Sequence, residues 1–233
     1  MRKFLAVLAL LATSACATPY VAIPYEADQN PVATITLIED VGSANVMAYE
    51  FASAGGNFGL VGAIVDAGVQ SSRRARVEEV LENAGFDAQA FFRTRLTEEL
   101  EALGYAVEIA QIDGRNRADL METYPDDGDE VQAYLDTVLR SYGFVSAGAG
   151  TPFRPHASVE AQLFNPDTDA VLMRNAVIYA SVGQPQGQIV LSPNPRHVYN
   201  NREELLEDPD RLVDAVRAAI SETAVTVARL LAP

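Results

Sequence analysis

The sequence predicts a single α+β domain, built as a mixed sheet of about five strands with helices mainly on one face. Three observations support this fold class. The 233 residues are 48% hydrophobic and 21% charged, which is close to the globular average and sufficient for a packed core. Segments with strand-like alternation are interleaved with segments of helical periodicity. Two further strands flank a turn near residue 167, as in a hairpin.

The first sixteen residues have the organisation of a secretion signal. Two basic residues precede nine apolar residues, 4–12, a stretch that is too short to span a bilayer. Residues 13–16, Thr-Ser-Ala-Cys, resemble the bacterial lipobox, in which the cysteine receives a diacylglyceryl group before cleavage makes it the first residue. We therefore expect residues 1–15 to be removed and Cys16, the only cysteine, to be the lipidation site.

Lipidation of Cys16 would also determine the location. Acyl chains contribute about 0.8 kcal/mol per buried CH₂, so several chains would hold the protein stably on a bilayer. Ala17 stands where, by resemblance to bacterial sorting signals, an Asp would retain the protein at the inner membrane. We expect an outer-membrane location facing the periplasm, with the membrane as a partner through the anchor. The alternative is an ordinary signal cut after Ala15 or Ala17, which would leave a soluble periplasmic protein.

A short tether is expected between the anchor and the domain. Residues 16–31 contain three prolines and no helical period, which is typical of an extended linker, and the domain then occupies residues 32–233. Residues 32–40 (VATITLIED) alternate and are rich in β-branched side chains, which predicts the first strand. We expect residues 46–52 to pair with it across the intervening Gly-Ser turn.

An apolar, glycine-rich segment follows, from Gly55 to Val69. We interpret it as a loop that passes into a helix packed against the sheet. A close-packed or membrane-apposed segment is the functional alternative, because small residues let backbones approach one another. The segment is too short to span a bilayer.

The middle of the chain contains the clearest helix, residues 87–103, in which apolar side chains recur every three to four positions and a glycine follows as a stop. A shorter helix is expected before it, over 73–81. Residues 105–112 alternate and predict a strand, and residues 114–130 predict a polar loop. Residues 131–142 fit either a helix or a wide buried strand, and their propensities do not separate the two.

The last part of the chain predicts a hairpin and a helix. Residues 158–165 and 170–182 read as strands around an Asn-Pro-Asp-Thr-Asp turn. Residues 183–200 are rich in proline and predict a loop, and a short helix at 202–206 precedes a long one that Pro209 opens. The inward stripe of that last helix consists of Leu212, Val216, Ile220, Ala224, Val227 and Leu231.

The charge balance excludes several classes of partner. With 17 Lys and Arg against 32 Asp and Glu, a net charge of −15 provides no basic surface for nucleic acid. Lys3 is the only lysine and lies in the segment expected to be removed, which excludes a lysine Schiff base and a phosphate-loop lysine. The glycine-rich segment also lacks the Gly-x-Gly-x-x-Gly spacing of a nucleotide site. We expect no cofactor.

Metal and catalytic motifs are equally scarce. His156 and His197 do not form an i, i+4 pair, so no zinc site is expected. The acidic residues 126–130 lack the spacing of a calcium loop and predict a solvated loop. No Gly-x-Ser-x-Gly elbow is present, although the members of a Ser/His/Asp triad need not be adjacent in sequence. We interpret His156 as a hydrogen-bonded surface histidine and expect no catalytic residue and no enzymatic activity.

A resemblance to known proteins rests on two patterns. The helix ends in Leu100-x-x-Leu103-Gly104-Tyr105-x-Val107, and the hairpin reads Val159-x-Ala161-x-Leu163-x-Asn165-Pro166-x-Thr168-x-Ala170-Val171-Leu172. This order of elements resembles uncharacterised proteobacterial envelope lipoproteins. It is more distantly similar to small α/β domains of periplasmic assembly lipoproteins, namely the curli-secretion lipoprotein, the penicillin-binding-protein activator lipoproteins and the amino-terminal domain of the Tol-system β-propeller protein. The resemblance covers about residues 32–182 and brings no catalytic residue with it.

These observations predict a non-catalytic cell-envelope lipoprotein that binds another protein or assembles with itself in the periplasm at the outer membrane. The alternative from another class is a periplasmic ligand-binding or hydrolytic protein. Its pocket would lie near the glycine-rich segment and near the stretch from Gly143 to His156.

Overall fold

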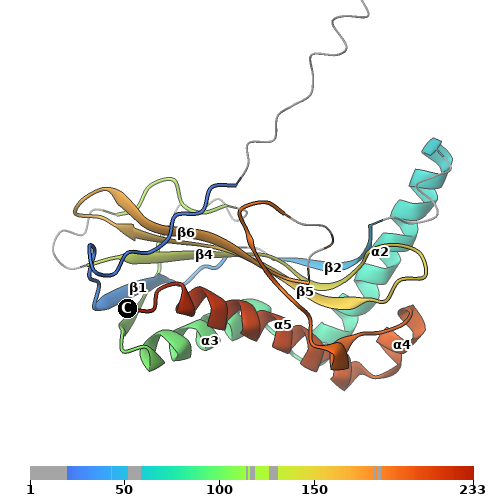
Figure 1. Ribbon diagram of the computed structural model, residues 1–233. Helices are drawn as coiled ribbons and strands as arrows, with labels where there is room; N and C mark the ends of the chain where they lie inside the picture. Colours follow the sequence, from blue (N-terminus) through green and yellow to red (C-terminus); the bar gives the residue numbers. More distant parts are fainter. Residues whose placement is uncertain are drawn as a thin grey trace, which may run out of the picture.

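The computed structural model describes residues 20–42, 44–51, 59–113, 115, 119–125, 131–180, 182 and 185–233. Over these residues the chain forms one α+β domain with a mixed seven-stranded sheet and four α-helices (Figure 1). The predicted fold class is therefore confirmed, with two strands more than the expected number. No helix among the described residues is both long and apolar enough to cross a membrane.

The elements follow one another along the chain with strands and helices mixed. In order they are β1 Thr34–Ile38, β2 Asn45–Glu50, α2 Gly59–Asn83, α3 Ala88–Ala102, β3 Ala106–Ala110, β4 Tyr134–Ser146, β5 Arg154–Asn165, β6 Ala170–Tyr179, β7 Ile189–Leu191, α4 Arg202–Glu207 and α5 Pro209–Arg229.

The central strand is β4, which lies in the segment whose helix and strand interpretations were both open. It is a strand of 13 residues, so the helical interpretation is wrong. On one side it pairs antiparallel with β5, and β6 continues the sheet as the predicted hairpin. On the other side β1 and β2 both pair with β4 in the parallel sense, one after the other along its length.

This arrangement corrects the expected hairpin of the first two strands. β2 pairs with residues 141–146 of β4, and β1 pairs with the beginning of β4 and, on its other edge, with β3. The chain between β1 and β2 therefore continues in the same direction instead of reversing. Such a parallel arrangement depends on pairing with β4, whose partner residues lie about 100 positions further along the chain, and no local pattern encodes it.

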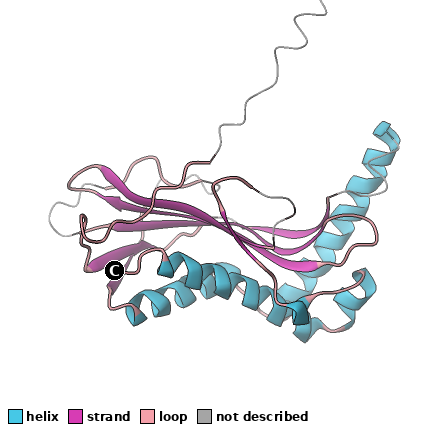
Figure 2. Cartoon of the chain, viewed as in Figure 1, coloured by secondary structure: helices cyan, strands magenta, loops and turns pink. Residues whose placement is uncertain are grey.

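Helices α3 and α5 cover one face of the sheet, as Figures 1 and 2 show. α3 begins after Asp87, whose carboxylate accepts hydrogen bonds from the first backbone N–H groups, and α5 begins in the same way after Asp208. The six residues of the predicted inward stripe of α5 are all fully buried, which confirms that prediction. The hydrophobic core lies between these two helices and the sheet.

Other boundaries differ from the expected ones. α2 begins at Gly59 and runs without a break to Asn83, so it merges the second part of the glycine-rich segment with the short helix expected at 73–81. α2 crosses the edge of the sheet beside β2 (Figure 1). The region 183–200, expected to be loop, contains the short parallel strand β7.

The opposite face of the sheet, which we call the open face, is covered by chain without regular structure. One part is the covering segment, residues 112–125 as far as they are described, and the other is the amino-terminal stretch from Tyr20 (Figure 1). Ile23 exchanges two backbone hydrogen bonds with Arg174 of β6, at 2.8 and 2.9 Å. The expected tether is therefore bound to the sheet at Ile23 and is not a free linker over its whole length.

Candidate functional site

The open face carries buried charged side chains from three neighbouring strands. The carboxylate of Glu160 on β5 accepts hydrogen bonds from Arg140 Nε on β4, at 3.0 Å, and from Arg174 Nη2 on β6, at 2.9 Å. Arg140 also donates to Asp119 in the covering segment, at 3.1 Å. Glu160 is almost fully buried, and its charge is compensated by both guanidinium groups. This cluster therefore joins strands and covering segment, and it leaves no unpaired carboxylate at its centre.

A second buried charge attaches the covering segment to the sheet. Asp136 on β4 is completely buried and forms an ion pair with Arg115, whose side chain is 1% exposed. Its carboxylate also accepts hydrogen bonds from the backbone N–H of Met121, at 2.7 Å, and from the hydroxyl of Tyr124, at 3.1 Å. Burial and then the charge of Asp136 raise the pKa of Tyr124, so its hydroxyl stays protonated and donates at neutral pH.

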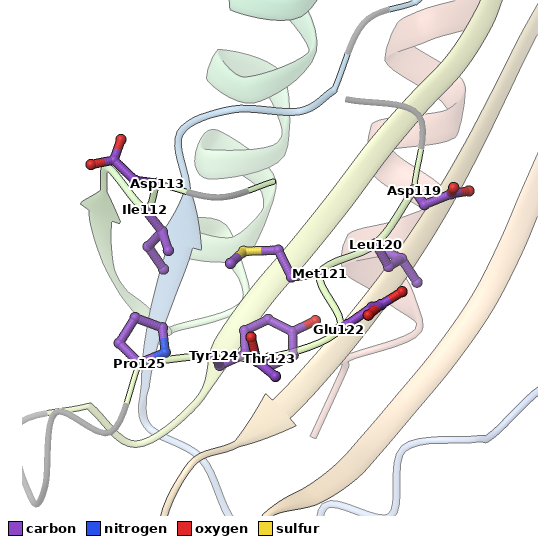
Figure 3. A pocket seen from close by; sticks show the side chains of 9 residues that line it. All are labelled: Ile112, Asp113, Asp119, Leu120, Met121, Glu122, Thr123, Tyr124 and Pro125. Carbon is purple, nitrogen blue, oxygen red and sulfur yellow. The ribbon is translucent and has the colours of Figure 1, made fainter. Parts of the chain in front are cut away.

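The covering segment encloses the largest of the hollows that we describe, with a volume of about 480 Å³ (Figure 3). It is lined by Ile112, Asp113, Asp119, Leu120, Met121, Glu122, Thr123, Tyr124 and Pro125. The carboxylates of Asp113 and Asp119 lie at opposite ends of the view, and Asp119 is paired with Arg140. The described lining residues include three acidic side chains and no cation, and such a lining disfavours an anionic ligand.

His156 lies on β5 and is buried, which corrects its interpretation as a surface residue. It is hydrogen-bonded, as expected: Nε2 is 3.0 Å from Ser141 Oγ on β4, and Nδ1 is 3.2 Å from the carbonyl oxygen of Ala180. Burial lowers the pKa of His156, and its hydrogen bond to Ala180 opposes that effect. The imidazole is therefore neutral at pH 7.

An exposed apolar surface lies where β2 meets α2. The rings of Tyr49 and Phe51 form an edge-to-face pair with centroids 5.0 Å apart, and these residues are 40% and 50% exposed. Val69 on α2 is 39% exposed, and a Cβ at the neighbouring Gly68 would contact nothing within 4 Å. We call these four residues the β2–α2 surface. Next to them in α2, Gln70 is buried, and its side-chain amide accepts a hydrogen bond from the backbone N–H of Glu50 and donates one to the Glu50 carbonyl oxygen.

The residues singled out from the sequence are placed as follows. Cys16 and the acidic residues 126–130 lie outside the described part of the chain, as do residues 55–58 of the glycine-rich segment. His197 lies in a short 3₁₀ turn and His156 in β5, and no group of three or more His, Cys, Asp or Glu among the described residues could hold a metal ion.

Sequence reasoning missed the paired charges of the open face. The sequence did contain a signal. Asp136 interrupts an apolar stretch, and the two strands of the predicted hairpin each carry one charged residue, Glu160 on β5 and Arg174 on β6. The partners of these charges come from other strands and from the covering segment. Their pairing therefore became visible only with the register of the sheet.

Comparison with known proteins does not assign the chain to a family. No protein-family model and no curated protein matches the chain. The fold and its sites define a single-domain α+β protein.

Proposed function

We propose that this chain is a lipid-anchored protein of the cell envelope, held at the periplasmic face of the outer membrane, that acts by binding another protein or a second copy of itself. The observation that carries the binding role is the exposed aromatic pair of Tyr49 and Phe51 on the β2–α2 surface. Aromatic side chains are enriched in protein interfaces, where they provide large contact areas at a small cost in side-chain entropy.

The position of the bound tether supports the anchoring role. Ile23 is seven positions after Cys16, and an extended chain of that length spans at most about 25 Å. Because Ile23 is hydrogen-bonded to β6, a lipid on Cys16 would hold the whole domain close to the membrane surface. A partner would accordingly be a protein at the same membrane, within reach of the β2–α2 surface.

The anchor is tested by replacing Cys16 with Ser. Without the thiol there is no acceptor for the diacylglyceryl group, so we expect radioactive palmitate labelling to disappear and the protein to move from the membrane fraction to the soluble periplasmic fraction. The measurement is labelling and fractionation of cells that express either form. Unchanged recovery with membranes in the variant would show that the attachment lies elsewhere.

The binding surface is tested by site-specific crosslinking in cells. A photoreactive residue at Val69 should give a defined adduct, whereas the same residue at Ile109 on β3, which is 54% exposed, should not. Phe51→Ser should reduce the Val69 adduct roughly five-fold to thirty-fold, as expected for loss of an interface anchor of about 1–2 kcal/mol. The melting temperature should change little, because the side chain is exposed.

The mass of the adduct distinguishes self-assembly from binding to a different protein. An adduct of twice the chain mass would indicate self-assembly, and any other single mass would indicate a different protein. Equal adducts at Val69 and Ile109, or a Val69 adduct that Phe51→Ser leaves unchanged, would contradict a binding role for this surface.

A further inference from the structure

Ser141 occupies an irregular position in the central strand. The register between β4 and β5 shifts between Leu139 and Ser141, so that β4 carries one extra residue there. Such bulges re-aim the side chains that follow them and are frequent next to active sites. Here the shift places Ser141 on the open face, diagonally across the strand pair from His156, and Ser141 remains partly exposed.

The hydrogen bonds of His156 define which of its nitrogens carries the proton. The carbonyl oxygen of Ala180 can only accept, so Nδ1 is the protonated nitrogen and donates to it. Nε2 then presents its lone pair and accepts the hydrogen bond of the Ser141 hydroxyl. A hydroxyl, a neutral imidazole and an orienting acceptor are the three parts that an activated serine requires, with a backbone carbonyl in the place of the usual carboxylate.

The orienting carbonyl belongs to a residue with an unusual backbone conformation. Ala180 has φ +55°, a left-handed conformation that an L residue other than glycine rarely adopts. A hydrogen bond from its N–H to the carbonyl oxygen of Leu191 holds it in place, at 3.0 Å. Residues with strained backbone conformations are concentrated at active sites and ligand-binding sites, where a group must be held in a fixed direction.

A small hollow lies further along the same strands and shares only Ala180 with this arrangement. It has a volume of about 210 Å³ and is lined by Val145, Ala147, Thr151, Pro152, Arg154, Ala180 and Val182. Val145 and Arg154 are register partners two residues along the strands from Gly143 and His156. The hollow is smaller than sites for drug-sized ligands, and Arg154 provides a positive charge at it. Neither Ser141 nor His156 lines it, and Val145 lies four residues along β4 from Ser141, about 13 Å at the usual strand rise, so the hollow does not hold the group that Ser141 would attack.

We propose that Ser141 is a nucleophile, with His156 as its general base, for the hydrolysis of activated acyl esters that reach the partly exposed Ser141 hydroxyl from solvent. Ser141 Oγ forms a bond to the ester carbonyl carbon while its proton passes to His156 Nε2. The carbon–alkoxide bond then breaks, and the leaving alkoxide takes that proton. Water, deprotonated by His156, attacks the acyl-serine, and release of the carboxylic acid restores the serine hydroxyl.

The experiment uses a fluorophosphonate probe on the full-length mature protein in detergent. The probe should form a phosphorus–oxygen bond with Ser141 as fluoride leaves, and mass spectrometry of the peptides should locate the adduct on that residue. Ser141→Ala should abolish the adduct. His156→Gln should slow its formation about 100-fold or more, the usual contribution of a general base. Ser158→Ala is the matched control, because Ser158 is the register partner of Ser141 on β5 and should leave labelling unchanged.

Turnover is measured separately with p-nitrophenyl acetate, and folding of each variant with its melting curve. Should Ser141→Ala fail to fold, Ser141→Cys retains a nucleophile at the same position and should show His156-dependent alkylation. A folded protein that gives no adduct at Ser141, or one whose ester hydrolysis survives Ser141→Ala, would overturn the proposal. In that outcome the Ser141–His156 hydrogen bond only joins two strands.

Discussion

Replacing Gly143 with Ala is expected to remove roughly 2–6 kcal/mol from the free energy of unfolding. Gly143 lies in β4 with φ +127°, a conformation that side chains rarely tolerate. A Cβ there would lie 2.1 Å from the backbone carbonyl oxygen of Met47, so β2 would have to move away from β4. Because natural domains are stable by only about 5–15 kcal/mol, this loss would be a large part of the total.

The measurement is urea unfolding of the variant and of a matched control, Gly68→Ala. Gly68 lies in α2, and a Cβ there would meet nothing within 4 Å, so the same substitution should stabilise the protein by up to about 1 kcal/mol through helix propensity. Opposite signs at the two glycines are the expected result. A change of less than about 1 kcal/mol at Gly143 would show that β2 is not held against β4 as described.

Local signals explain which elements the sequence could predict. Helices α3 and α5 have carboxylate caps and regular apolar periods, and both lie where the sequence placed them, to within two residues. In the turn of the β5–β6 hairpin, the side chain of Asn165 accepts from the N–H of Thr168 at 2.9 Å, as its turn chemistry predicts. Each of these features depends on residues close together in sequence.

The central strand lacked such a signal for a physical reason. The first six residues of β4 are all buried, because α5 covers one face and the covering segment covers the other. A strand buried on both faces shows no alternation of apolar and polar residues, and its apolar pattern can equally be read as a helix. The bulge after Leu139 disturbs the period further.

The pairing of Ser141 with His156 could not be predicted either, because it depends on the register between β4 and β5. Ser141 and His156 are separated by fourteen residues in sequence and meet only because β4 and β5 pair antiparallel around the bulge. His156 was interpreted as a surface residue because it follows Phe153-Arg154-Pro155 at the expected entry of a strand. It is buried because its neighbours on β4 and the turn after β6 close over it.

Loss of the buried ion pair between Arg115 and Asp136 is also expected to lower the free energy of unfolding strongly. Asp136→Ala should destabilise the protein by about 3–5 kcal/mol, because it leaves the guanidinium of Arg115 buried without its counter-charge. It also removes the acceptor of the Met121 N–H and of the Tyr124 hydroxyl. The covering segment should therefore become more sensitive to proteases than the rest of the domain, since these bonds attach it to the sheet.

A paired apolar replacement separates the charge pair from the packing. Combining Asp136→Leu with Arg115→Met should be less destabilising than Asp136→Ala alone, because the two apolar side chains leave no buried charge. The control is Glu78→Ala, which breaks the exposed ion pair with Arg74 at 3.6 Å and should cost less than about 1 kcal/mol. If Asp136→Ala cost no more than this control, the pair would be solvated in solution, and the covering segment would be held to the open face by its aromatic contacts, chiefly the stacking of Tyr124 on Phe164.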